Sequence, residues 1–184
     1  AIYEGADAVM LSAESAAGKY PIEAVQTMNN VAISVESDPV YREIIEASRK
    51  AKRTTVADGI VAAAREIAEA TNIKAICSFS QSGTTAALVS RERPRVPIIA
   101  LTPLMETARR MCLTWGAHCV ITEEQDRFKG AVISAVRAAR DYGFAEEKDQ
   151  IVLTAGVPFN VQGTTNILRV APCDERLIYR VDPE

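Results

Sequence analysis

The chain has 184 residues, of which 48% are hydrophobic and 5% aromatic, and its formal net charge at pH 7 is −3. A chain of this length can bury a core of its own, and that core must be largely aliphatic because so few residues are aromatic. A slightly acidic balance lacks the basic footprint of proteins that bind nucleic acid or anionic membranes, so we exclude both as partners.

The first predicted element is a short buried strand. Residues Ala8 to Leu11 form a continuous apolar run that ends in a polar loop carrying an acid. Such a run is typical of a strand buried on both faces of a parallel sheet. Because such a strand needs neighbours and the chain starts with Ala rather than Met, we expect the partner strands in a longer parent protein.

Two helices are predicted next. The first runs from Pro21 to about Ser37, with a proline at its first position and apolar residues every three or four positions. Asp38-Pro39 should end it. The second spans Tyr41 to Lys50, with Ile44 and Ile45 turned inward. The basic link that follows, residues 50–53, is the best candidate for a boundary, so we expect two parts, 1–50 and 51–184.

Helices and strands alternate from Thr54 onward. Thr54 or Thr55 is expected to cap a helix that continues through Glu69. The later predicted elements, in chain order, are a strand at 74–80, a helix at 84–92, a strand at 97–102, a helix at 105–115, a strand at 118–122, a helix at 127–142 and strands at 150–155 and 166–170. The last connection is too short for a crossover and favours an antiparallel strand.

These elements predict an α/β fold. We expect a mostly parallel five-stranded sheet with helices on both faces and an antiparallel edge strand. In such a doubly wound sheet the first and fourth strands commonly lie side by side, and ligands bind in the crevice beyond their carboxyl ends.

A loop rich in small and hydroxyl residues follows the first of these strands. It contains Ser80, Ser82, Gly83, Thr84 and Thr85. Small residues let the backbone approach a ligand closely, and the N–H groups of a helix start point at an anion, so this loop suits phosphate binding. The alternative is that Ser82 or Thr84 only caps the helix. A second loop, 154–166, carries Gly156 and Gly163 and is expected to face the same crevice.

The cysteines and the histidine indicate no catalytic or metal site. Cys77, Cys112, Cys119 and Cys173 lack CxxC spacing and lie mostly in apolar segments, so we expect buried free thiols rather than ligands or disulfides. His118, at the start of an apolar strand, is expected to be structural. With no long apolar stretch and no leader-like beginning, the sequence predicts a cytoplasmic protein.

Several motifs resemble those of pyruvate kinase. Residues Met10 to Pro21 are similar to the loop that ends the last strand of that family's catalytic (β/α)8 barrel, with Ala13 where the family often has Gly and Ser15 where it usually has Thr. Further matching segments, in the family's order, are Pro21–Val25, Ser82–Thr85, Pro97–Thr102, Leu153–Gly156 and Gly163–Asn166. The resemblance implies that 1–50 is a remnant of the barrel and 51–184 the carboxyl-terminal allosteric domain.

By this resemblance the crevice is an allosteric site for a sugar phosphate or similar effector, and the loop from Ser80 to Thr85 holds a phosphate. Relatives that respond to fructose 1,6-bisphosphate often carry a longer segment with a Trp and an Arg after the third strand. Here the segment 122–127 is short and acidic; Arg127 matches the Arg, but there is no Trp. A monophosphate effector such as AMP, ribose 5-phosphate or glucose 6-phosphate is therefore expected.

Ser12 and Glu14 lie at the carboxyl end of the barrel-like strand, the edge where barrel enzymes keep their active sites. By resemblance they belong to the active-site wall. The equally weighted alternative is a loop carboxylate that caps the next helix.

The resemblance implies that the parent transfers a phosphoryl group from phosphoenolpyruvate to ADP, using Mg²⁺ and K⁺ bound outside this chain. It also implies an upstream catalytic domain and a homo-oligomer, a tetramer in the parent, whereas the chain alone should be catalytically silent. Two other functions stay open. They are a free-standing module that binds a phosphorylated ligand and a purely structural oligomerisation domain.

Overall fold

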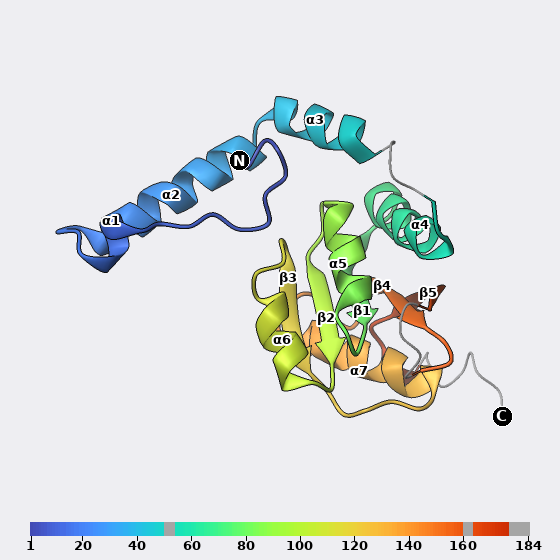
Figure 1. Cartoon of the computed structure of the whole chain (residues 1–184). Coiled ribbons are helices and arrows are strands. Elements are labelled where there is room, and N and C mark those ends of the chain that lie inside the picture. Colours follow the sequence, from blue (N-terminus) through green and yellow to red (C-terminus); the bar gives the residue numbers. More distant parts are fainter. Residues whose placement is uncertain (50–53, 160–163, 177–184) are drawn as a thin grey trace. The chain divides into compact units, whose positions relative to one another are not determined.

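The structure is a computed structural model that describes residues 1–49, 54–159 and 164–176. The chain divides into two compact units, Ala1–Arg53 and Thr54–Glu184, here called the amino-terminal and the carboxyl-terminal unit (Figure 1). The basic link that the sequence suggested as a boundary, residues 50–53, lies outside the described residues.

The amino-terminal unit contains three helices, α1 (Ala13–Ala16), α2 (Pro21–Glu36) and α3 (Pro39–Arg49). The predicted break between the two longer helices is confirmed, because Asp38 lies between them and its carboxylate accepts a hydrogen bond from the Val40 N–H at 2.9 Å. The Tyr3 hydroxyl donates to the other Asp38 oxygen at 2.6 Å. This bond ties the start of the chain to the helix junction.

The predicted strand at Ala8–Leu11 is wrong for this structure. These residues have no regular secondary structure, and the Met10 side chain is 88% exposed. The physical reason is that a strand exists only by pairing its backbone with another strand, and the described residues of the amino-terminal unit contain none. Ile44 is also not inward, since it is 42% exposed, whereas its neighbour Ile45 is 5% exposed.

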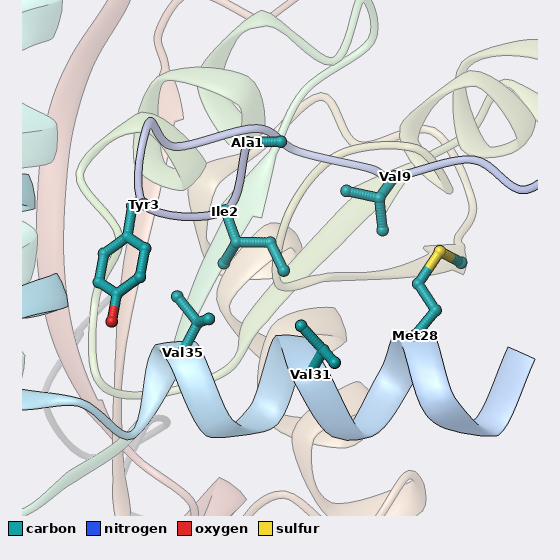
Figure 2. Close-up of a pocket in the computed structure, with 7 residues that line it drawn as sticks. All are labelled: Ala1, Ile2, Tyr3, Val9, Met28, Val31 and Val35. Carbon is teal, nitrogen blue, oxygen red and sulfur yellow. The ribbon is translucent and has the colours of Figure 1, made fainter.

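An apolar groove of about 360 Å³ lies in the amino-terminal unit instead. Figure 2 shows Ile2 and Val9 above one face of α2, from which Met28, Val31 and Val35 project toward them. The apolar periodicity of α2 thus places its side chains on one face, as predicted, and within this unit the first residues of the chain lie over that face.

The carboxyl-terminal unit alternates helices and strands, close to the predicted boundaries. Its elements are α4 (Val56–Ala70), β1 (Ile73–Phe79), α5 (Thr84–Arg91), β2 (Ile98–Thr102), α6 (Met105–Met111), β3 (Ala117–Ile121), α7 (Phe128–Asp141), β4 (Gln150–Gly156) and β5 (Thr165–Pro172). In the described residues the sheet order is β3-β2-β1-β4-β5. The first four strands are parallel and β5 is antiparallel to β4, which confirms the predicted fold.

Helices cover both faces of this sheet. Neighbouring residues of one strand point to opposite faces. Ile99 therefore packs with α7, through residues such as Val132 and Val136, while Ile98 packs with α4 through Val61. All five side chains are fully buried. Both clusters consist largely of Ala, Val, Ile and Leu, as the composition predicts.

Local hydrogen bonds fix where α4 begins and where α6 ends. Thr55 caps α4: its hydroxyl accepts from the Asp58 N–H at 3.2 Å, and the Asp58 carboxylate accepts from the Thr55 N–H at 3.0 Å. Helix α6 is shorter than predicted and stops before Trp115, because the amides of Leu113 and Thr114 bond to carbonyls three residues back. None of the helices that the structure describes is long and apolar enough to cross a membrane.

Candidate functional site

The loop after β1 turns the chain sharply into α5. The Ser80 hydroxyl accepts a hydrogen bond from the Gly83 N–H at 3.0 Å, which closes the turn. Gly83 precedes the helix with φ +83°, a left-handed conformation that favours glycine. Because α5 begins here, its first amides, starting at Thr84, have no carbonyl one turn back to bond to, and they point out of the helix end.

The hydroxyls of Ser82 and Thr84 lie together at this helix start. Their oxygens are 2.9 Å apart, and the Thr84 N–H approaches the Ser82 oxygen at 3.4 Å. Thr84 is exposed and Ser82 is half-buried. Two hydroxyls and the first amides of a helix form a cluster of donors at one place, which is the arrangement that accepts a phosphate.

Thr85 differs from its two neighbours because it faces inward. Its hydroxyl lies 2.7 Å from that of Thr165 on β5, and its side chain is 5% exposed. The hydroxyl of Thr85 therefore links α5 to the end of the sheet. Its part in the candidate site is limited to its backbone N–H.

Helix α6 holds the loop from the other side. The Thr107 hydroxyl donates to the carbonyl of Gln81 at 2.7 Å, and the Arg110 guanidinium donates to the carbonyl of Ser82 at 2.6 Å. A Cβ on Gly83 would lie 2.6 Å from the Met111 sulfur. The sequence did not predict these contacts from α6. The one feature that pointed to them is that α6 follows β2, the strand beside β1.

The loop after β4 reaches the same edge of the sheet, because β1 and β4 are neighbours as predicted. Gly156 allows a close approach of β5: a Cβ there would lie 2.9 Å from the Thr164 carbonyl oxygen. The Asn166 side chain accepts from the Val157 N–H at 2.9 Å and donates to the Val157 carbonyl at 2.6 Å. Gly163, the other predicted glycine of this loop, lies outside the described residues.

The loop after β3 also touches the first loop, through an acid. The Gln81 amide donates to the Glu124 carboxylate at 3.2 Å. Arg127 is the residue just before α7 and has an extended backbone. The structure thus places a negative charge beside the loop after β1. A contact between Arg127 and a ligand stays a prediction.

Ser12 and Glu14 interact with each other in the amino-terminal unit. The Glu14 carboxylate accepts a hydrogen bond from the Ser12 N–H at 3.1 Å. Backbone N–H groups of Glu14 itself and of Ser12 lower the pKa of this carboxyl group. Glu14 lies in α1 itself and bonds back to the residue before that helix, whereas α2, the helix that the sequence predicted next, begins without a side-chain cap. A role of Ser12 and Glu14 in an active-site wall stays a prediction.

The cysteines are only partly as expected. Cys77 and Cys173 are fully buried, and burial raises the pKa of Cys173 to about 11. Cys112 is exposed, so the expectation of a buried thiol is wrong there, because α6 ends one residue earlier. His118 packs against Tyr142 and Phe144, with ring centroids 4.7 and 5.1 Å away. No cluster of His, Cys, Asp or Glu in the described residues could hold a metal ion.

Comparisons with known proteins agree with this architecture. Residues 58–171 match the family model described as the alpha/beta domain of pyruvate kinase. A pyruvate kinase of Methylorubrum extorquens is 45% identical over 171 residues, covering 93% of this chain and 36% of the relative. One from Agrobacterium vitis is 44% identical over 170 residues, covering 92% and 36%. The crystal structure of a pyruvate kinase from Cryptosporidium parvum superposes with a TM-score of 0.78 at 27% identity, covering 94% of this chain and 34% of that one. The chain spans about a third of the length of these proteins.

Proposed function

Because this chain belongs to the pyruvate kinase family, we propose that it is the carboxyl-terminal part of a pyruvate kinase and that this part binds a phosphorylated effector. The parent would transfer a phosphoryl group from phosphoenolpyruvate to ADP, giving pyruvate and ATP. The Mg²⁺ and K⁺ that this chemistry requires would be bound outside this chain, by an upstream catalytic domain.

The paired hydroxyls of Ser82 and Thr84 carry the effector proposal. They lie 2.9 Å apart at the start of α5, beside amides that no helical carbonyl satisfies. A phosphate seated there would accept from both hydroxyls and from these amides, and the positive end of the helix would favour its charge. The bonds from α6 to the Gln81 and Ser82 carbonyls keep the loop in this shape without a ligand.

The charge around the loop favours a monophosphate. The Glu124 carboxylate is hydrogen-bonded to Gln81, so a second phosphate directed toward the loop after β3 would meet a negative charge. We therefore propose AMP, ribose 5-phosphate or glucose 6-phosphate ahead of fructose 1,6-bisphosphate. Arg127 and the loop that carries Gly156 and Gly163 would contact the rest of the effector.

Two further parts of the proposal concern assembly and catalysis. In the described sheet β5 pairs on one side only, so its other edge offers backbone groups to a two-fold partner, and we propose a homo-oligomer, a tetramer in the parent. Ser12 and Glu14 would form part of the active-site wall of the parent. The 184-residue chain alone would have no pyruvate kinase activity.

A free-standing phosphate-binding module is the second candidate. It is favoured by one observation: residues of the carboxyl-terminal unit supply the hydrogen bonds that shape the loop after β1. Such a module would bind the same ligands, but the protein expressed from the full coding frame would show no pyruvate kinase activity. Pyruvate kinase activity of the parent, with a lower kcat in its Glu14→Ala variant, would exclude it.

Calorimetric titration of the chain with AMP, ribose 5-phosphate, glucose 6-phosphate and fructose 1,6-bisphosphate tests the effector site. Ser82→Ala combined with Thr84→Ala should weaken binding at least tenfold, since each lost charge-assisted bond is worth about 1.5–3 kcal/mol. The matched control is Ser37→Ala with Thr71→Ala, whose hydroxyls bond only to carbonyls of their own helices and whose loss should leave Kd unchanged. If no ligand binds the wild type, or if the loop variant binds as tightly, the loop is only a helix cap.

A further inference from the structure

Two cysteine thiols lie against each other beside the candidate site. Cys112 is the residue just after α6, and Cys119 lies in β3, opposite Ala100 of β2. Cys119 is on the sheet face that packs with Met111 of α6. Its thiol is hydrogen-bonded to the sulfur of Cys112, whose own thiol donates to the Ala108 carbonyl at 3.4 Å. The two sulfurs are therefore close neighbours.

The two thiols differ in access. Cys112 is exposed and Cys119 is half-buried, whereas Cys77 and Cys173 are fully enclosed. Burial, with a smaller contribution from Cys112, raises the pKa of Cys119. A small oxidant from solvent therefore reacts with Cys112 first, and the less accessible Cys119 supplies the second thiol.

We propose that Cys112 and Cys119 form a reversible intramolecular disulfide that equilibrates with low-molecular-weight disulfides such as glutathione disulfide. The Cys112 thiolate attacks one sulfur of the small disulfide, forms a mixed disulfide and releases one thiolate. Cys119 then loses its proton and attacks the Cys112 sulfur, releasing the second small thiol. Two protein thiols are oxidised to one S–S bond, and one small disulfide is reduced to two thiols.

The backbone at Cys112 can make the required approach. A disulfide needs sulfurs about 2.05 Å apart, so the sulfurs must close in by roughly 1.5–2 Å from hydrogen-bonding distance. The end of α6 is held by long bonds, from the Cys112 N–H to the Arg109 carbonyl at 3.3 Å and from the Leu113 N–H to the Arg110 carbonyl at 3.4 Å. Weak bonds of this kind yield at small cost.

The disulfide would act on the helix that holds the candidate phosphate loop. Arg110 and Met111, which contact Ser82 and Gly83, immediately precede Cys112. Pulling the end of α6 toward β3 moves these contacts, so oxidation should change the Kd for a phosphorylated ligand by at least twofold. This consequence rests on the proposed function, whereas the disulfide itself does not.

Mass spectrometry tests the disulfide directly. The 184-residue chain is equilibrated in glutathione redox buffers, quenched with acid, alkylated and cut with trypsin, which leaves both cysteines in the peptide Met111–Arg127. We expect this peptide to be lighter by two hydrogen atoms and unalkylated, and Tm to rise by about 5 °C on oxidation. Both effects should vanish with dithiothreitol and in Cys112→Ser.

Two variants separate the steps. Cys119→Ser should accumulate a glutathione adduct on Cys112, because no second thiol can release it, and Cys173→Ala should form the disulfide as the wild type does. The proposal is wrong if the wild type keeps the glutathione adduct, if both thiols stay alkylatable, or if Cys112 instead links two chains. Equal AMP affinity of the oxidised and reduced chains would refute only the coupling to α6. If neither the oxidised nor the reduced chain binds AMP, the proposed function is wrong, and the disulfide is then decided by the mass of the tryptic peptide alone.

Discussion

The two units of the chain use the same kind of helix with opposite results. In the carboxyl-terminal unit the apolar faces of α4 and α7 meet a sheet and are buried, with side chains such as Val61 and Val132 fully enclosed. In the amino-terminal unit neither α1 nor α2, both described in full, contains a buried residue. Apolar periodicity determines which face of a helix is apolar, but that face is buried only where a second layer of helices or strands packs against it.

The amino-terminal unit shows what such a helix looks like without that layer. Ile22 of α2 is 69% exposed, and within this unit Ile2 and Val9 line the groove opposite α2. Helices of this length gain most of their stability from packing rather than from propensity. The difference between the units should therefore appear as a difference in stability, and four experiments can break or sharpen it.

The largest effect is expected from separating the units. Residues 54–184 expressed alone should unfold in one cooperative transition with a Tm within a few degrees of that of the whole chain, because the clusters of buried core residues that the structure describes lie in this unit. Residues 1–53 alone should show no cooperative transition. Calorimetry and circular dichroism measure both, and a cooperative transition in the smaller piece would contradict the comparison.

A matched pair of isoleucines gives the next largest effect. Ile99→Ala, in β2 and fully buried, should lower the free energy of unfolding by about 2–5 kcal/mol by removing apolar contacts and leaving a cavity. Ile33→Ala, in α2 and 55% exposed, should change it by no more than about 0.5 kcal/mol. Urea titrations compare the two, and similar losses would mean that α2 is buried in solution.

The cap of α4 should give a smaller, pH-dependent effect. Hydrogen bonds from the Arg91 guanidinium, the Thr55 hydroxyl and nearby backbone amides lower the pKa of Asp58 well below its usual value. The stabilisation is therefore complete above the unfolded-state pKa of about 3.9 and is lost as pH falls toward the lower folded-state pKa. Asp58→Asn should cost about 1–2 kcal/mol at pH 7, and its difference from the wild type should shrink below pH 4. A difference that is constant down to pH 2 would refute the role of the charge.

The smallest expected effect is a gain in stability. Gly59 lies inside α4, and a Cβ there would meet no atom within 4 Å. Gly59→Ala should stabilise the unit by about 0.5–1 kcal/mol through helix propensity. Gly83→Ala is the contrasting change, because φ +83° and the Met111 sulfur both oppose a side chain there. Thermal unfolding of the two variants should move Tm in opposite directions.

Local signals were sufficient to predict most of the carboxyl-terminal unit. Thr54 or Thr55 was expected to cap α4, and Thr55 does so; the short connection before β5 indicated its antiparallel direction. The neighbouring position of β1 and β4 followed from the rules for doubly wound sheets. These predictions depend on residues a few positions apart or on general topology, so one sequence contains the information they need.

The errors occur where local signals compete with tertiary contacts. Ala8–Leu11 has the composition of a strand but no strand beside it in the described residues, and Ile44 has the spacing of a core residue but is 42% exposed. Helix α6 ends earlier than predicted because the amides of Leu113 and Thr114 bond to carbonyls three residues back. In each case the pattern describes a preference, and the available neighbour decides the outcome.

For the candidate site, the sequence by itself determined which loop carries the donors, because a cluster of hydroxyls before a helix has the same chemistry in any doubly wound fold. Only the tertiary structure decided that Thr85 turns inward to Thr165, that Thr107 and Arg110 hold the loop, and that Cys112 lies against Cys119. The reason is physical. Most of these contacts join segments more than twenty residues apart, and all of them depend on how elements pack against the sheet, which no local pattern encodes.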